Sequence, residues 1–166
     1  MKYSSPVPVL AVVLLVAAGF ILLSGQSLPP VVASHFGAGG SANGYMSRGA
    51  YLGLMLVMTL VVPGVLAVGH RLVGRVPRRR VSLPERDYWL APERSAETFS
   101  FLRRHLSYLS ALSAVFFCFV HWLVVRANAL QPPQLSVSLF FGGLVAFLVA
   151  VAVWVAALLV RFRRRA

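Results

Sequence analysis

Long apolar stretches separated by polar or basic segments dominate the pattern of this chain. The stretches lie at about 7–23, 51–68, 105–125 and 136–160, and none carries Asp, Glu, Lys or Arg near its centre. Each is close to the roughly 20 residues that an α-helix needs to cross a hydrocarbon core about 30 Å thick. The pattern predicts an all-α integral membrane fold, a single domain over 1–166 with four transmembrane helices, and Pro63 predicts a kink in the second helix.

The Lys and Arg residues fall almost entirely on one side of such a four-span arrangement. Of the 16, only Arg48 and Arg126 lie opposite the rest. Because positive charge near the ends of spans is retained in the cytoplasm, we expect both termini and a basic loop at 69–104 to be cytoplasmic. A glycine-rich loop at 24–50 then faces outward. A cleaved signal peptide in place of the first span would leave the orientation of the other helices unchanged.

Composition supports a membrane protein: 58% of the residues are hydrophobic, 12% are charged and the mean hydropathy is +0.78. The formal net charge of +12 raises the question of nucleic acid, but the arginines flank apolar runs instead of alternating with recognition residues. We therefore expect no nucleic-acid partner. The lipid bilayer is the expected partner, with anionic headgroups binding the arginines that the acidic residues leave unpaired. These are Arg78, Arg79, Arg80 and the C-terminal Arg161, Arg163, Arg164 and Arg165.

The basic loop also contains a helix signal. All four acidic residues of the chain lie there, at positions 85, 87, 93 and 97, where we expect them to pair with neighbouring arginines. Pro92 suits the first position of a helix, and Glu93 places negative charge in its first turn. With no Gly or Pro from Glu93 to Val125, we predict one long helix that begins in the loop and becomes the third span.

The histidines and the cysteine form no recognisable site. Topology divides the histidines into an inner pair, His70 and His105, and an outer pair, His35 and His121. Neither pair has the spacing that sets two metal ligands on one helix face. Cys118 is the only cysteine, so an intramolecular disulfide and a thiolate cluster are both excluded. We expect no metal, no cofactor and no enzyme activity.

Two further patterns concern local structure. The glycine-rich loop lacks the Gly-Lys-Ser/Thr ending of a phosphate-binding loop. Its Asn43-Gly44 dipeptide predicts a tight turn of the kind found in short hairpins. Small residues at four-residue spacing predict close helix packing in the third and fourth spans. They are Ser110, Ala114 and Cys118 in the third, and Gly142, Ala146 and Ala150 in the fourth.

Two motifs resemble those of a bacterial membrane-domain family of unknown function, a domain also found at the front of immunity proteins against the sporulation-delaying toxin. The first motif runs from Leu28-Pro29 through His35-Phe36 to Asn43-Gly44-Tyr45-Met46-Ser47-Arg48, with Asn43 and Tyr45 where the family has Asp and Trp. The second is Asp87-Tyr88-Trp89-Leu90-Ala91-Pro92-Glu93-Arg94. The resemblance covers roughly 5–125 and implies a location in the bacterial inner membrane.

The resemblance carries over motif residues as interaction candidates and not as catalysts: His35, Phe36, Gly44, Arg48, Tyr88, Trp89, Pro92, Glu93 and Arg94. Tyr88 and Trp89 have two possible roles, docking the loop on the membrane surface or forming an exposed anchor for a partner. We expect a non-enzymatic protein that acts through contacts with other membrane proteins, as an accessory subunit or alone. Toxin immunity or signalling is the first alternative, and a small transporter is the second.

Overall fold

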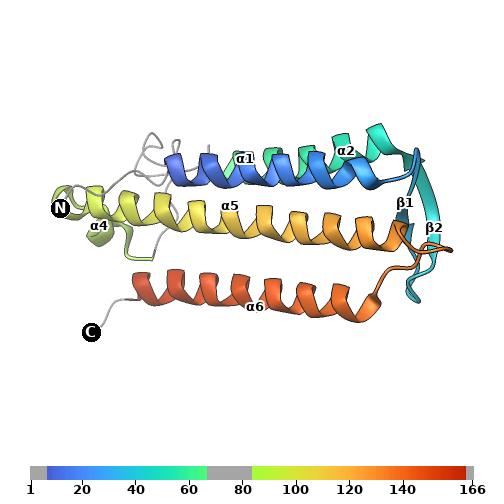
Figure 1. Ribbon diagram of the computed structural model, residues 1–166. Helices are drawn as coiled ribbons and strands as arrows, with labels where there is room; N and C mark the ends of the chain where they lie inside the picture. Colours follow the sequence, from blue (N-terminus) through green and yellow to red (C-terminus); the bar gives the residue numbers. More distant parts are fainter. Residues whose placement is uncertain (1–6, 67–83, 164–166) are drawn as a thin grey trace.

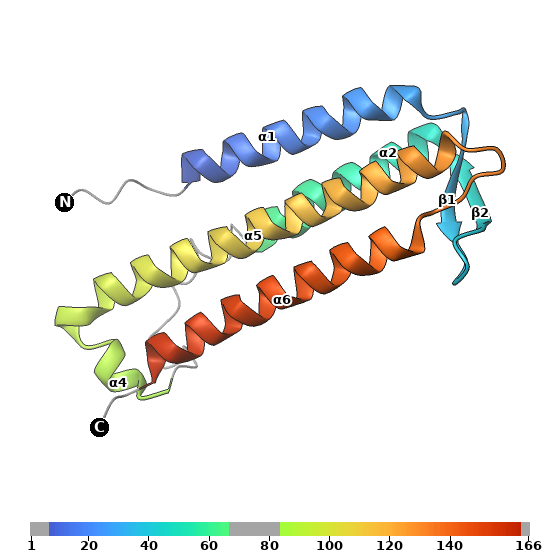
Figure 2. The ribbon, with the colours of Figure 1, turned by 60° about the horizontal axis from the view of Figure 1, so that its bottom comes forward.

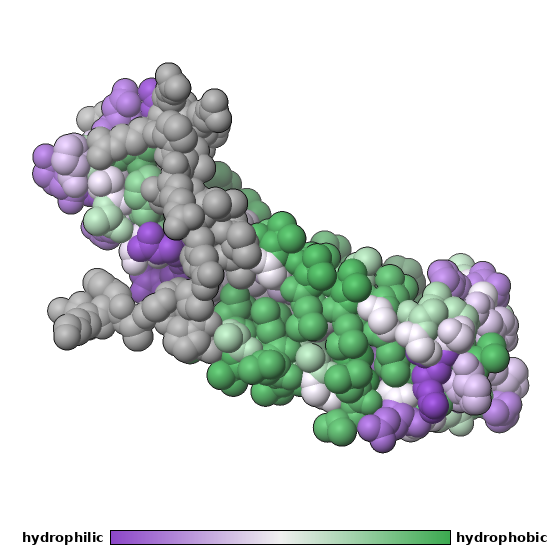
Figure 3. All heavy atoms as spheres, turned by 90° about the horizontal axis from the view of Figure 1, so that it is seen from above, coloured by the Kyte–Doolittle hydropathy of each residue, from purple (hydrophilic) through white to green (hydrophobic). Residues whose placement is uncertain are grey.

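Four long helices run side by side in the computed structural model, which describes residues 7–66 and 84–163 (Figure 1). They are α1 (Val7–Ser24), the continuous apolar helix Arg48–Leu66 that begins as α2 (Arg48–Leu56), α5 (Pro92–Asn128) and α6 (Val137–Phe162). All four are long and apolar enough to cross a membrane, which confirms the predicted spans. Figure 3 shows the apolar band between two polar ends.

A β-hairpin of β1 (Val31–Phe36) and β2 (Ala42–Ser47) covers one end of the helices, and the short α4 (Arg86–Trp89) lies at the other (Figure 2). We call these the hairpin end and the α4 end. α1 begins and α6 ends at the α4 end, as an even number of spans requires. The fold is therefore helical throughout its spans, with one small sheet in the loop that the sequence placed outside.

The hairpin differs from the prediction in where it turns. Asn43-Gly44 lies within β2, where Gly44 pairs with His35 across the ladder. The chain reverses between Gly37 and Ser41, where the Gly37 N–H donates to the Ser41 carbonyl at 2.9 Å. Gly40 has φ +82°, a conformation that glycine adopts without steric cost. The prediction of a turn at Asn43-Gly44 was wrong, although a hairpin forms.

The second span contains a backbone irregularity close to the predicted kink. A π-helical segment, η2 (Val57–Val61), precedes Pro63 before the helix continues to Leu66. Proline has no N–H to donate to the carbonyl four residues earlier, so the hydrogen-bond ladder must change there. In a regular α-helix that carbonyl would be the one of Thr59, whose buried hydroxyl has no hydrogen-bond partner among the described residues.

The third span is one continuous helix from the α4 end to the hairpin end, as predicted. Pro92 occupies the start of α5 after the extended Ala91, and Glu93 lies in the first turn. At 1.5 Å per residue, the 37 residues of α5 extend about 55 Å, well beyond a hydrocarbon core of about 30 Å. The helix is thus longer than a single crossing needs, and at the α4 end it packs against α4.

α6 packs chiefly against α5, which lies between it and the other two spans (Figure 2). The Trp154 indole donates to the His105 carbonyl at 2.8 Å, and His105 Nε2 lies 3.0 Å from the Trp154 carbonyl oxygen. A Cβ at Gly143 would overlap the Phe119 ring, whereas nothing lies within 4 Å of one at Gly142. The predicted contact at Gly142 was therefore wrong by one residue.

Candidate functional site

The first sequence motif builds the hairpin end, and a small apolar core holds the hairpin against the helices. Val32 of β1 is fully buried beside Ile21 near the end of α1, Leu28 in the segment that follows α1, Tyr51 and Met55 from α2, and Val124 from α5. Phe36, a predicted motif residue, packs against the edge of this core. One face of the hairpin is thus part of the protein interior, and the other faces away from the helices.

Arg48, another motif residue, is used for structure. Its backbone N–H donates to the Pro30 carbonyl at 2.9 Å, and its Nη1 donates to the Leu28 carbonyl at 3.2 Å. The Ser47 hydroxyl accepts a bond from the Ala50 N–H and caps α2. Arg48 therefore joins the end of α1 to the start of α2 and satisfies carbonyls that the turn leaves open.

Asn128, which the sequence analysis did not single out, binds the free edge of β1. Its Oδ1 accepts from the Ala33 N–H at 2.9 Å, and its Nδ2 donates to the Ala33 carbonyl at 2.9 Å. The same Nδ2 donates to the Val124 carbonyl at 2.9 Å. The side-chain amide thus pairs with the backbone of Ala33 as a neighbouring strand would. It also attaches the hairpin to the last turn of α5.

The tip of the hairpin is attached to the loop between α5 and α6. The Gly40 carbonyl accepts from the Leu135 N–H at 2.8 Å, and the Gly39 carbonyl accepts from Gln134 Nε2 at 2.8 Å. A Cβ at Gly40 would overlap the Leu135 carbonyl oxygen, so this close approach also requires glycine. Together with Asn128, these bonds hold the hairpin at both of its ends.

His121 lies fully buried beneath the hairpin, between α1 and α2, in a hydrogen-bond chain that the sequence did not reveal. Ser24 Oγ donates its single proton to the Phe20 carbonyl and lies 3.0 Å from His121 Nε2. Nε2–H must therefore donate to Ser24. In a neutral imidazole Nδ1 is then the acceptor, and the Tyr51 hydroxyl, 3.0 Å away, donates to it. Both ring nitrogens of His121 therefore have hydrogen-bond partners within the protein.

His35 and Gly44 are brought together across the strands. A Cβ at Gly44 would lie 2.9 Å from the His35 Cβ and 3.2 Å from its Nδ1, so the missing side chain makes room for the imidazole. His35 itself is exposed, and its Nδ1 lies 3.0 Å from the Ser34 hydroxyl. Of the two histidine pairs, the outer one contains His121, whose ring nitrogens both have protein partners, and the inner one contains His70, which lies outside the described residues.

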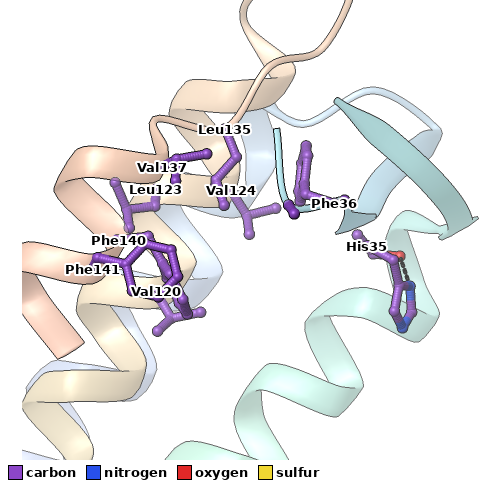
Figure 4. A pocket seen from close by; sticks show the side chains of 12 residues that line it. His35, Phe36, Val120, Leu123, Val124, Leu135, Val137, Phe140 and Phe141 are labelled. Carbon is purple, nitrogen blue, oxygen red and sulfur yellow. Dashed lines mark hydrogen bonds between the residues drawn. The ribbon is translucent and has the colours of Figure 1, made fainter. Parts of the chain in front are cut away.

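An apolar cavity of about 410 Å³ lies between the hairpin tip, α5 and α6. Figure 4 shows Leu123, Phe140 and Phe141 on its helical side and Phe36 on the hairpin, whereas the His35 imidazole points away from it. No group of three or more His, Cys, Asp or Glu side chains that could hold a metal occurs in residues 7–66 and 84–163. The lining is mostly apolar, and its polar residues are Ser34 and His35 on the hairpin side.

The second motif connects α4 to α5 at the opposite end. Trp89 is only 8% exposed, its ring packs edge-on against Phe162 at 5.3 Å, and its carbonyl accepts from the Thr98 hydroxyl at 3.0 Å. It is therefore not an exposed anchor. Tyr88 is exposed, and the Arg94 guanidinium lies 4.0 Å from the centre of its ring.

The arginines that were predicted to bind anionic lipid headgroups differ in their surroundings. Arg161 donates to Glu97 at 2.8 Å and lies 4.7 Å from the centre of the Trp89 ring, so it is held within the protein instead. Asp87 pairs with Arg86 at 3.4 Å, which agrees with the predicted local pairing. Arg163 is exposed at the end of α6. Residues 78–80 and 164–165 lie outside the described part of the chain.

Four apolar helices with the basic residues gathered at their ends place the chain among multi-pass membrane proteins. Residues 12–59 match the family model of a domain of unknown function, DUF1648, which spans most of α1, the hairpin and most of the second span. The match includes the first motif, and the second motif lies outside it. No curated protein and no solved structure matches the chain.

Proposed function

We propose that this is a non-enzymatic membrane protein that acts through protein contacts at the hairpin end, as an accessory subunit of a larger assembly or alone. In the proposed topology both termini are cytoplasmic, in the bacterial inner membrane, and the hairpin faces outward. The observation that carries the proposal is a hairpin fixed to the helices from several sides, which presents a constant outer surface to a partner.

The exposed residues of that surface suit binding. Tyr45 is 57% exposed at the position where the resembling family has Trp, and Val31 is 61% exposed on the neighbouring strand. Asn43 and His35 are exposed nearby. Aromatic side chains with few rotatable bonds are the residues that most often dominate binding energy at protein interfaces, and the rigid strands lower the entropy lost on association.

The hydrogen-bond directions at His121 argue against hydrolase chemistry. Ser24, His121 and Tyr51 have the residue types of a nucleophile, a base and an orienting group. However, the Ser24 hydroxyl donates its proton to the Phe20 carbonyl and not to His121, and the His121 ring is 0% exposed. A nucleophile needs the opposite direction of proton transfer and access to a substrate.

Toxin immunity or membrane signalling is the alternative that one observation favours. α5 is a single helix that holds β1 through Asn128 at one end and contacts α4 through Thr98 at the other. A ligand that displaced the hairpin would act directly on α5. A small transporter has less support, because no span carries a charged residue near its centre.

Purification in a mild detergent from the native membrane tests the proposal. Comigration with a stable multisubunit complex supports it, provided that the doubly substituted His35→Ser, Tyr45→Ser chain is released from that complex. The Asp87→Asn chain, altered at an exposed carboxylate of the α4 end, is the matched control and should comigrate normally. A lone small particle, or equal retention of all three chains, would refute contacts through the hairpin.

Topology has its own test. A reporter fused after Ala166 should be active only in a form that works in the cytoplasm, and one inserted beside Ser41 only in a form that works after export. Activity of the exported form after Ala166 would overturn the proposed orientation.

A further inference from the structure

A second cavity lies at the hairpin end, on the other side of the corner between α5 and α6. Its volume is about 320 Å³, within the range of small-molecule sites. It combines apolar and polar side chains, namely Leu123, Leu130 and Leu139 with Arg126, Gln134 and Ser136. Gln134 is already committed to the hairpin tip. The Ser136 hydroxyl lies 3.4 Å from the Ser138 hydroxyl, one contact that leaves it able to make a second hydrogen bond, so Arg126 and Ser136 are the polar groups offered to a ligand.

Arg126 has no acidic side chain of the chain to pair with at this end. The four acidic residues lie between 85 and 97, and Glu97 is 29 residues earlier on the same helix, about 43 Å away along its axis. The guanidinium is exposed and lies 4.9 Å from the centre of the Trp122 ring. The cavity therefore offers a positive charge that the rest of the protein leaves uncompensated.

The position of the cavity corresponds to the headgroup level of a bilayer. α5 ends at Asn128 and α6 begins at Val137, so the corner between them is where the chain leaves the membrane. Trp122 is a residue typical of that boundary. Leu130 and Leu139 are 51% and 44% exposed, so the apolar wall of the cavity is continuous with the surface that faces lipid.

We infer that this cavity binds an anionic phospholipid, with the phosphodiester on Arg126 and Ser136 and the start of one acyl chain along Leu139. Charge complementarity selects the phosphate, and the apolar wall selects a ligand that carries a chain. The site lies at the opposite end of the helices from α4 and the end of α6. It is also separate from the exposed hairpin face proposed to contact proteins.

Site-resolved photo-crosslinking of the full chain in lipid nanodiscs tests this inference. The probe is phosphatidylglycerol with a photoreactive group near the top of one acyl chain, and the readout is the crosslink yield mapped by mass spectrometry to residues 129–139. Mapping by position is needed because the many arginines at the α4 end also attract anionic lipid. We expect Arg126→Gln to lower the yield about fivefold, and Arg126→Lys to keep most of it.

Three controls separate the possible sources of binding. Arg163→Gln removes an exposed arginine of the α4 end and should leave the yield at 129–139 unchanged. Leu139→Ser should lower the yield while leaving the charge in place. Millimolar inorganic phosphate should not compete, because it lacks the chain.

The inference is overturned by an equal yield in Arg126→Gln, which would mean lipid contact without a headgroup site, or by efficient competition from inorganic phosphate. If Arg126→Gln fails to fold, Leu139→Ser and the competition with inorganic phosphate decide instead. A yield that Leu139→Ser does not change would also reject a lipid chain in the cavity.

Discussion

Replacing Asn128 with alanine removes the link between α5 and the hairpin and leaves two backbone groups of Ala33 without partners. Ala33 is fully buried, and its N–H and carbonyl both bond to this amide at 2.9 Å. A net loss of about 1 kcal/mol of stability for each bond gives about 2 kcal/mol for Asn128→Ala. That energy corresponds to a roughly 30-fold increase in the opening of β1.

Amide hydrogen exchange in micelles measures this opening directly. We expect the Ala33 and Val32 amides to exchange roughly 30 times faster in Asn128→Ala, with little change in the middle of α5. Asn128→Asp keeps an acceptor for the Ala33 N–H but sets a carboxylate beside two carbonyl oxygens, so it should not restore protection.

Asn43→Ala is the matched control, because Asn43 is an exposed asparagine on the same hairpin. Its effect should stay within about 0.5 kcal/mol. If the Ala33 amide exchanges at the same rate in Asn128→Ala, the hydrogen bonds of Asn128 do not hold β1 closed. A similar increase of the exchange rate in Asn43→Ala would show that the hairpin is generally labile.

Gly44→Ala should lower the free energy of unfolding by about 1–3 kcal/mol in a denaturant titration, because the new Cβ would lie 2.9 Å from the His35 Cβ. Nitrogen-15 NMR should find His121 neutral with its proton on Nε2, and Tyr51→Phe should remove the hydrogen-bond shift at Nδ1. Glu97→Gln should cost less than about 1 kcal/mol and less still at high salt, because its side chain is 75% exposed.

Each of these three has an outcome that contradicts it. Gly39→Ala, where nothing lies within 4 Å of an added Cβ, should have no effect and serves as the control for Gly44. A proton on Nδ1 would reverse the hydrogen-bond chain deduced for His121. A loss of several kcal/mol in Glu97→Gln would mean that solvent does not screen the ion pair.

The four helices were predictable because length and hydropathy are local properties of the sequence. The start of α5 was also predictable, since Pro92 and Glu93 act within one turn. The hairpin turn was misplaced because the loop contains several glycines. The dipeptide with the strongest turn signal, Asn43-Gly44, uses its glycine to accommodate His35 instead.

The polar contacts of the hairpin end could not be predicted, because their partners are far apart in sequence. His121 lies 97 residues from Ser24 and 70 from Tyr51, and Asn128 lies 95 from Ala33. The signal in the sequence was a single polar residue at the end of an apolar run, and ordinary helix packing also produces that pattern. The burial of Trp89 could not be predicted for the same reason, because Phe162 comes from the other end of the chain.

The boundaries of the matched domain have a consequence for how this fold can be divided. Residues 12–59 contain the hairpin and parts of the two helices that flank it, but the groups that secure the hairpin from below, His121, Val124 and Asn128, all come from α5. A fragment that stopped after the second span would expose Val32 and leave Ala33 unpaired. In this chain the matched segment is therefore not a structural unit by itself, because the contacts that secure its hairpin extend to Asn128 of α5.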